Sequence, residues 1–583
     1  MARLSAGSIL PARSAVKRAR RARKASGDGV SLGATERLLG PTEIAGLGGG
    51  TVLDVIIRRG KIVDGSGTPW VLGDVGVQGD RIVAVGNLDG ARAARVVDAS
   101  GKIVCPGFID SHSHSDWSVM ANRRCESTIR MGVTTEVVGN CGTTYAPVTD
   151  VNRESARLAV AKGQPGVDLA WSTFAEYLEA VQAGGLSENL VYLVGHGAIR
   201  QAVMGQAERP ATPDEVRRMA AHLEEALEAG AFGMSTGLEF NPGRSATPDE
   251  LIALNRVITR YDGVHASHQR TRNEEFEQSA AEILGVCEAA GTRFQMSHVN
   301  ARPGAPAGSW WRVMDQVWAA RARGLDATCD STLYERGLGN MAAVLPSWLF
   351  DRGPAVAAER LGDPEIRRKV RGDCRRYQLV VANQEWEKVW LGTTVNSRHL
   401  FGKRFDEIGE IAGKDPFDCF FDILEAEGPA ITGAGMFCQL KTPEHLREMI
   451  THPLFSLGAD AWTATVDGPL APMVNHPSSF GWTARVIAEY ARDQRWLSVE
   501  EMIRKMTAFP ALKFRIPDRG LVRPGAYADL VVFDLDALRA NATYENPRQY
   551  CTGFEYVFVN GVLTVERGEH LGALAGRVLR YRS

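Results

Sequence analysis

Long apolar segments are missing from this sequence of 583 residues. No run approaches the roughly 20 apolar residues of a membrane-spanning helix, which argues against a membrane-embedded protein. An excess of charge of one sign is missing too, because 67 basic and 69 acidic residues leave a formal net charge of -2. Neither nucleic acid nor an anionic membrane is therefore an expected partner. The length and the 44% share of hydrophobic residues indicate a globular protein with one large domain and appendages, or with two or three domains.

The sequence also lacks paired cysteine motifs. Its nine cysteines are scattered, and none are spaced as CxxC. An odd number of such cysteines is typical of reduced thiols rather than of a disulfide framework. We therefore expect a cytoplasmic protein.

The first 50 residues contain no acidic residue before Asp28 and include the basic, alanine-rich stretch RSAVKRARRARKASGDG. The apolar core of about 7 to 15 residues that a secretory signal needs does not follow this stretch. We predict that residues 1–50 form a disordered basic tail. A start codon assigned too early, a targeting segment and a contact with nucleic acid are the alternatives.

Two kinds of strand pattern divide the remaining chain. Short alternating runs separated by glycine occupy 51–106 and return over 511–583, which predicts one small β-sandwich built from both chain ends. Over 107–510, strand-like runs alternate with amphipathic helices such as TPDEVRRMAAHLEEALEAG. The predicted fold is therefore α/β: a (β/α)8 TIM-type barrel with a small β-sandwich domain.

The segment 334–400 is long for a barrel loop and is predicted to be a lid insertion. It carries Trp348, Trp386 and Trp390, which could line a lid over a large apolar acyl or aromatic group. The alternative is that these tryptophans fill contacts between helices.

The stretch CPGFIDSHSHSD places two histidines at the end of a strand-like run. Residues i and i+2 of a strand point to the same face, so His112 and His114 are expected to project together. Active sites of barrels lie at the carboxyl ends of the strands, so this pair is typical of a metal-binding fork. The alternative is a pair of hydrogen-bonded surface histidines.

Other strand-like runs also end on residues that bind metals. GVHASH ends with His265 and His268, RFQMSH ends with His298, and LFSLGAD and TTEVVGNCG carry Asp460 and Cys141. Zinc accepts imidazole, thiolate and carboxylate ligands together, whereas a thiolate disfavours magnesium and calcium. These residues predict a zinc site at one mouth of the barrel.

The motifs PGFIDSHSH and GLVRPGAYADLVVFD, with the later histidines and the aspartate between them, resemble the amidohydrolase superfamily. The cysteine of VVGNCGTTYAP, with STGLEFNPG, DATCDSTLY and GRVLR, is similar to the D-aminoacylases, the N-acyl-D-amino-acid deacylases. The resemblance covers nearly everything after residue 51. It implies zinc-dependent hydrolysis of an N-acyl amide, most simply of an N-acyl-D-amino acid to a carboxylate and a D-amino acid.

The resemblance also implies a set of ligands. One tightly bound zinc ion is expected on Cys141, His268 and His298, and a second, weaker or empty site on His112, His114 and Asp460. His268 is favoured over His265 because the family motif H-x-R matches His268 and Arg270. Asp460 is expected to act as general base and then as general acid, with a helix cap as the alternative.

A small-molecule amide is the expected partner, and a homo-oligomer is compatible with the sequence. Arg270 and Tyr334 are candidate substrate-binding residues, because guanidinium and hydroxyl groups bind carboxylates. However, Asn300 stands where the family has a lysine and Ser478 where it has an arginine, which weakens the case for a substrate carboxylate. The alternative function is hydrolysis of another amide, such as a cyclic amide, an imide or a carboxylate-free xenobiotic. A catalytically silent binding protein is the least favoured hypothesis.

Overall fold

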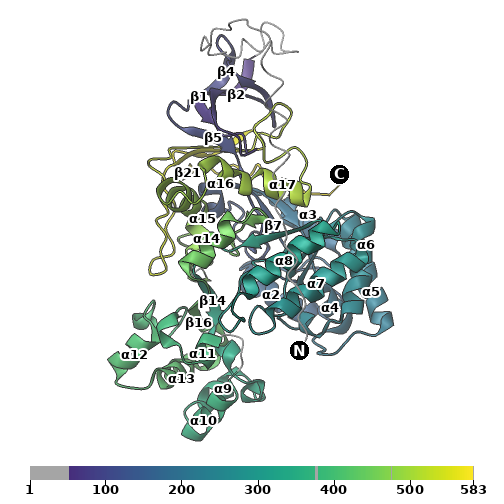
Figure 1. Ribbon diagram of the computed structural model, residues 1–583, viewed down its shortest axis with the longest axis vertical. Helices are drawn as coiled ribbons and strands as arrows, with labels where there is room; N and C mark the ends of the chain where they lie inside the picture. The colour runs from purple at the N-terminus through teal and green to yellow at the C-terminus, as the bar shows by residue number, and fades with distance from the viewer. Residues whose placement is uncertain (1–51, 375–378, 474–475, 582–583) are drawn as a thin grey trace, which may run out of the picture. The chain divides into compact units, whose positions relative to one another are not determined.

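The computed structural model describes residues 52–374, 379–473 and 476–581 (Figure 1). The tail predicted for residues 1–50 lies outside these described residues. Within them, no helix combines the length and the apolar character needed to span a bilayer. The chain is of mixed α/β class, as predicted, and contains one mixed sheet, parallel sheets covered by helices, and a smaller antiparallel sheet.

Strands from both ends of the chain form the mixed sheet of nine strands. β1 (Val52–Ile62) pairs with β2 (Val71–Gln78), β4 (Arg92–Asp98) and β5 (Ile103–Pro106), and β3 (Arg81–Gly86) pairs with β2. β5 pairs antiparallel with β18 (Leu530–Phe533), after which β19 (Phe554–Val559), β20 (Val562–Glu566) and β21 (Glu569–His570) follow. Val55, Val104 and Val532 belong to one buried hydrophobic cluster. The two chain ends therefore share a core.

Two parallel sheets occupy the middle of the chain. Their strand orders are β17-β13-β12-β11-β10-β9 and β22-β8-β7-β6. The strands are β6 (Phe108–Asp110), β7 (Val133–Val138), β8 (Asn189–Tyr192), β9 (Val194–Gly195), β10 (Gly233–Gly237), β11 (Val264–His268), β12 (Arg293–Met296), β13 (Ala327–Ser331), β17 (Phe455–Leu457) and β22 (Val578–Leu579). Nearly all their residues are buried, as expected for parallel strands with both faces covered.

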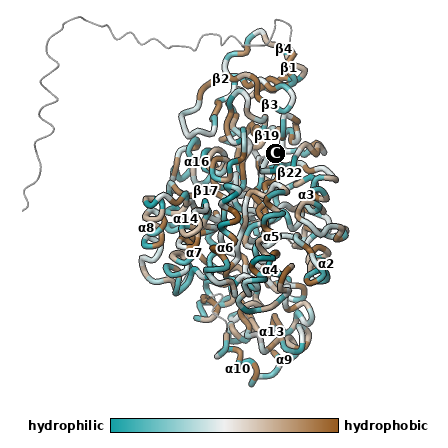
Figure 2. Tube along the Cα trace, turned by 90° about the vertical axis from the view of Figure 1, so that its right-hand side faces the viewer, coloured by the Kyte–Doolittle hydropathy of each residue, from teal (hydrophilic) through white to brown (hydrophobic). Residues whose placement is uncertain are grey.

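Amphipathic helices connect successive parallel strands. α5 (Pro213–Glu228) begins at Thr212, whose side chain accepts from the backbone N–H of Glu215 in a capping box. Its buried residues Met219, Leu223, Ala226 and Leu227 recur every three to four positions, so one face packs inward. Figure 2 shows hydrophobic and hydrophilic residues interspersed along the helices in this region. α5 contacts α6 (Pro248–Arg260), which contacts α7 (Phe276–Ala290), which contacts α8 (Ser309–Ala322).

The insertion between β13 and β17 extends beyond the predicted boundary at residue 400. β14 (Arg336–Asn340), β15 (Val389–Leu391) and β16 (Gly435–Gln439) form an antiparallel sheet, with α9 (Pro354–Arg360), α10 (Pro364–Gly372), α12 (Phe405–Ala412) and α13 (Pro416–Glu427) around it (Figure 1). β16 pairs with both β14 and β15, so the sheet is complete only at residue 439. Trp386 packs against Phe405 and Phe420 in the core of this insertion.

The last strand departs from the predicted division at residue 511. β22 pairs in parallel with β8, and Val578 is buried in the same hydrophobic cluster as Leu190. The chain therefore returns from the mixed sheet to the parallel sheet, because the apolar residues of GRVLR find their burial there. The segment 511–583 contributes to both parts of the fold.

Candidate metal centre

The residues predicted to bind metal follow or end five different parallel strands. His112 and His114 follow β6, Cys141 follows β7, His268 ends β11, His298 follows β12, and Asp460 follows β17. The carboxyl ends of neighbouring parallel strands meet at one edge of a sheet. Side chains that are far apart in the sequence therefore converge.

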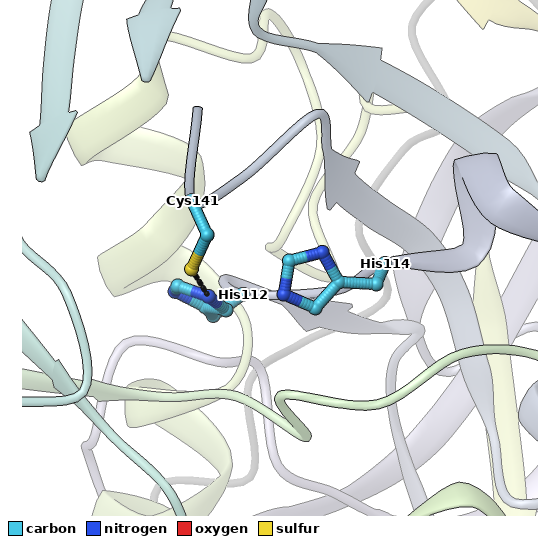
Figure 3. Close-up of side chains that lie close together, drawn as sticks. All are labelled: His112, His114 and Cys141. Atoms are coloured by element: carbon cyan, nitrogen blue, oxygen red, sulfur yellow. Dashed lines mark hydrogen bonds between the residues drawn. The ribbon is translucent and has the colours of Figure 1, made fainter. Parts of the chain in front are cut away.

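Cys141 lies at the centre of these side chains. Its Sγ is 3.5 Å from His112 Nε2, 3.5 Å from His268 Nδ1 and 3.4 Å from His298 Nε2. Figure 3 shows the Cys141 sulfur against the His112 ring, with His114 beside it. A tetrahedral zinc ion, about 2.3 Å from sulfur and about 2.05 Å from nitrogen, separates those two ligand atoms by about 3.6 Å. Each of the three observed separations fits a sulfur and a nitrogen atom that share a zinc ion, and His268 and His298 form one ligand group with Cys141.

Asp460 completes the cluster on the side of the histidine pair. Its Oδ1 lies 3.3 Å from His114 Nε2 and 3.6 Å from His112 Nε2. Three groups of three residues place their ligand atoms within 4.8 Å of one another: His112, His114 and Cys141; Cys141, His268 and His298; and His112, His298 and Asp460. Several residues belong to two groups, so the donor set fits one ion or two neighbouring ions.

The backbone at three of these residues is left-handed. The φ angles are 53° at Cys141, 35° at His298 and 48° at Asp460. Such a conformation costs a residue other than glycine about 1–2 kcal/mol, and it persists only where the surroundings enforce it. Next to Cys141, a Cβ on Gly142 would lie 2.7 Å from the backbone nitrogen of Gly237. The chain is therefore held tightly in the turn that presents the thiol.

Two buried carboxylates orient the histidines. His268 donates from Nε2 to Glu239 Oε2 at 2.6 Å, which leaves Nδ1 facing Cys141. Asp330 Oδ1 lies 3.3 Å from His112 Nδ1 and accepts from the backbone N–H of His298 at 2.6 Å. A carboxylate behind a metal-bound histidine fixes the ring and raises its basicity. Neither carboxylate was predicted from the sequence, where the available signal is an acidic residue at or just after a buried strand.

His298 has a cation behind it instead. Arg272 Nη1 lies 2.7 Å from His298 Nδ1 and donates to His298 O at 2.8 Å and to Asn300 Oδ1 at 3.2 Å. The arrangement explains the departure from the family pattern at Asn300. A lysine there would place a second positive charge against the buried Arg272 guanidinium, whereas the amide oxygen accepts its hydrogen bond.

Charges within the cluster set its protonation state. Burial alone would raise the pKa of the Cys141 thiol, but the positive charges of His112 and His298 hold that pKa well below 9. Burial would likewise raise the pKa of Asp460, but the hydrogen bond from His114 and the charges of His298 and His112 hold it well below its usual range. At neutral pH the cluster therefore offers a thiolate and a carboxylate.

A model of the amidohydrolase family matches residues 95–565. The chain belongs to the amidohydrolase family. Its sequence is 30% identical to a D-aminoacylase of Alcaligenes xylosoxydans xylosoxydans, over 90% of this chain and 97% of that protein. It is 31% identical to an N-acyl-D-glutamate deacylase of the same organism, over 87% of this chain and 93% of that protein.

Solved structures that superpose on this chain include proteins of the same two names. A crystal structure of D-aminoacylase superposes with a TM-score of 0.73 at 30% identity, covering 91% of this chain and all of that one. An N-acyl-D-glutamate deacylase from Bordetella bronchiseptica, complexed with zinc and a phosphonate inhibitor, gives a TM-score of 0.74 at 28% identity, with the same coverage. The predicted membership in the D-aminoacylase family is confirmed.

The two histidines of VHASH, His265 and His268, lie on opposite faces of β11. They are three positions apart, and side chains of a strand alternate between its faces. His268 reaches Cys141, whereas His265 Nε2 lies 3.0 Å from Thr236 Oγ1, and burial lowers the pKa of His265 to about 3. The structure therefore groups His268, and not His265, with the metal-binding side chains.

Arg270 does not reach the cluster. Its guanidinium makes a bidentate ion pair with Glu282 on α7, at 2.9 and 2.8 Å, and donates to the carbonyl oxygen of Ala246 at 3.0 Å. These partners fix α7 against the strand ends. The structure thus places Arg270 outside the cluster and paired with Glu282, and its role in binding substrate stays a prediction.

A cavity of about 460 Å³ opens over the cluster. Its lining contains Tyr334, whose buried hydroxyl has no hydrogen-bond partner among the residues that the structure describes. Ser478 does not line this cavity, because its hydroxyl donates to the carbonyl oxygen of Ala459. The tryptophans in the lining are Trp117 and Trp462, rather than those predicted within 334–400.

Replacement of Glu239 by glutamine is expected to weaken zinc binding of this amidohydrolase about 10–100-fold. The neutral amide no longer balances the proton on His268 Nε2, so the ring becomes a poorer ligand. Competition against a chelator of known affinity measures the change. Glu282→Gln is the matched control, because it removes a carboxylate that pairs with Arg270 outside the cluster. Equal zinc affinity of the wild-type and Glu239→Gln proteins would contradict the supporting role of Glu239.

Proposed function

We propose that this amidohydrolase hydrolyses N-acyl-D-amino acids at a zinc centre and releases a carboxylate and a D-amino acid. The observation that carries the proposal is the convergence of a thiolate, imidazoles and a partly exposed aspartate at the floor of one cavity. Relatives that span nearly the whole chain, named D-aminoacylase and N-acyl-D-glutamate deacylase, support the same substrate class.

Cys141, His268 and His298 would hold the tighter zinc ion, because their sulfur-to-nitrogen separations fit tetrahedral ligation and one ligand is a thiolate. His112, His114 and Asp460 would form a second, weaker site. When bound, zinc supplies a Lewis acid that activates water and polarises a carbonyl oxygen. No magnesium or calcium site would use a thiolate in this way.

Asp460 would carry the proton. Its carboxylate is ionised at neutral pH, and 32% of its side-chain surface is exposed, so water and substrate can reach it. Oδ1 would accept a proton from the attacking water and return it to the departing amine nitrogen. His114 holds this oxygen at 3.3 Å, and the His114 ring stacks on Trp117 with centroids 4.5 Å apart. The base is thereby oriented before substrate binds.

We also infer that the parallel strands close into a (β/α)8 barrel, with the mixed sheet as its small β-sandwich domain. Leu193 alone separates β8 from β9 in the chain, which links the two parallel sheets. On the opposite side, Asp460 N–H donates to His112 O at 2.8 Å, and His114 N–H donates to Ala461 O at 2.7 Å. These bonds join the segments after β17 and β6, as closure requires.

The test pairs metal analysis with N-acetyl-D- and N-acetyl-L-amino acids, including leucine, glutamate and aspartate, assayed on the zinc-loaded full chain. Zinc with D-selective release of amino acid is the expected result. Turnover of hydantoins or neutral amides alone would favour the alternative amide hydrolase, which the asparagine at 300 and the serine at 478 support. Bound zinc without turnover of any amide would favour a silent binding protein.

Replacement of Tyr334 by phenylalanine is expected to lower kcat/KM about 3–10-fold without destabilising the fold. Tyr334 lines the cavity, and its buried hydroxyl has no hydrogen-bond partner in the described part of the chain, so it contributes no internal hydrogen bond there and we expect it to serve the substrate. Steady-state kinetics and thermal unfolding measure the two effects. Tyr490→Phe is the control, because Tyr490 donates to the carbonyl oxygen of Leu333 at 3.2 Å. That variant should lose about 1 kcal/mol of unfolding free energy and keep its kcat/KM.

A further inference from the structure

The space around the metal cluster differs in polarity between its two sides. A second cavity, of about 770 Å³, shares Cys141, Trp117 and Trp462 with the cavity over the cluster. Among the described residues that line this larger cavity, the exposed Lys162 is the one charged side chain besides the Cys141 thiolate. The cavity over the cluster, in contrast, is lined by several cations. In a bound substrate, the acyl group on one side of the amide bond and the carboxylate on the other would therefore contact different cavities, one mostly uncharged and one lined by cations.

Three of the four lysine and arginine side chains lining the cluster cavity are already engaged. Arg272 donates to His298 and Asn300, as described above. Arg302 forms an ion pair with Glu239 at 2.9 Å. Arg336 lies over the ring of Trp390, with its Cζ 3.8 Å from the ring centroid. Hydrogen-bond partners within the protein thus engage Arg272 and Arg302, whereas Arg336 is stacked on an aromatic ring and 24% of its side chain is exposed.

Lys441 is the fourth cation. It lies in the loop between β16 and α14 (Pro443–Thr451), and only 5% of its surface is exposed. Its Nζ donates to the hydroxyl and the carbonyl oxygen of Thr332, two residues before Tyr334. Within the described part of the chain, no carboxylate forms an ion pair with Lys441. A buried ammonium without a counter-charge is costly, so the site is electrostatically incomplete.

We propose that Lys441, together with the hydroxyl of Tyr334, binds the carboxylate of the substrate. This inference rests on the proposed function and names the residue that selects for an amino acid product. Lys441 supplies the positive charge that the family pattern places at 300 and 478, positions that here carry asparagine and serine. Lys441 and Tyr334 both line the cluster cavity, and the Lys441 ammonium is bound to Thr332, two residues before Tyr334.

The electrostatics of the site agree with an anionic ligand. The pKa of Lys441 is lowered to about 7, first by burial and then by the positive charges of Arg272 and Arg302. The negative charges of Asp460 and Glu335 act against this shift. A carboxylate against Nζ would favour the charged ammonium and restore its usual protonation. Tyr334 would donate to the same carboxylate, because its phenol stays protonated when burial raises its pKa.

The experiment compares N-acetyl-D-leucine with N-acetyl-D-leucinamide, which lacks the carboxylate, on zinc-loaded wild-type and Lys441→Met proteins. Methionine keeps the length of the side chain and removes the charge. Loss of a charge-assisted hydrogen bond is expected to lower kcat/KM for the acid about 10–100-fold, mainly through KM, and for the amide less than about 3-fold. Lys441→Arg, which keeps the charge, should keep the preference for the acid.

Lys505→Met is the matched control. Lys505 is also fully buried and donates to backbone carbonyl oxygens, those of His452 and Phe455 at 2.7 Å, but it does not line the cavity. Its replacement should lower the melting temperature and leave the acid-to-amide ratio of kcat/KM unchanged. An unchanged ratio in Lys441→Met, or an equal loss on both substrates, would overturn the carboxylate role while the hydrolase activity stands. Wild-type protein that hydrolyses neither substrate would overturn the proposed function and this inference with it.

Discussion

Replacement of Cys141 by alanine is expected to remove bound zinc and hydrolytic activity together. The thiolate is the one ligand that lies within 3.5 Å of His112, His268 and His298 at the same time. Structural zinc sites bind with about 10–16 kcal/mol, so loss of one of the three protein ligands proposed for the tighter ion weakens binding by about 3–5 kcal/mol, or roughly 10²–10⁴-fold. Elemental analysis after dialysis and a deacylation assay measure both losses.

The control for this variant is Cys287→Ala. Cys287 is more deeply buried than Cys141 and lies on α7, where burial raises the pKa of its thiol. We expect Cys287→Ala to bind zinc and turn over substrate as the wild type does, with a small loss of melting temperature from the lost packing. Full zinc content in Cys141→Ala would show that the histidines and Asp460 suffice, and would refute the assignment of the thiolate as the central ligand.

Replacement of Asp460 by asparagine is expected to lower kcat about 10²–10⁴-fold while zinc stays bound. Asparagine has nearly the same shape, but its amide does not accept a proton at neutral pH. The tighter zinc ion is proposed to sit on Cys141, His268 and His298, so this substitution leaves all three of its ligands in place. Single-turnover kinetics with a zinc determination on the same sample separate the loss of proton transfer from the loss of metal.

Asp467→Asn serves as the matched control, because Asp467 lies in the same loop after β17 and is exposed. It should leave kcat and zinc content unchanged. If Asp460→Asn lost its zinc in proportion to its activity, Asp460 would be a ligand of the tight site rather than the proton carrier. If it kept its kcat, another group would have to move the proton.

The local pattern of the sequence was sufficient to find the residues of the cluster. Alternation along a strand predicts that His112 and His114 project together, and strand ends in a parallel sheet predict that Cys141 and His298 lie near them. The structure brings these side chains together at 3.4 to 3.5 Å from the thiol or within one ligand group. Such rules depend only on neighbours in the chain, so they can be applied without a fold.

The partners of these residues could not be predicted in the same way. Arg270 follows His268 by two positions and matched the family motif, yet Glu282 from a later helix holds its guanidinium. Glu239 and Lys441 acquire their places only when β10, β11 and the loop before α14 come together. An ion pair forms where two distant segments of the chain pack together. The periodicity of one segment does not predict which other segment it packs against.

The boundaries between the parts of the fold likewise depend on tertiary pairing, whereas the type of each part follows from local sequence. Glycine-punctuated strand patterns at both chain ends, and βα patterns between them, identified the classes of structure from residue 51 onward. Tertiary pairing decided where each part ends: β16 completes the insertion's sheet, and β22 leaves the C-terminal β strands to pair with β8. By itself, the sequence determined the α/β class and the cluster of candidate metal ligands, because local periodicity and side-chain chemistry encode them, and its motifs identified the family by resemblance. Only the tertiary structure decided which cation is free for substrate and which carboxylates support the histidines, because burial and charge pairing arise between segments that are far apart in the chain.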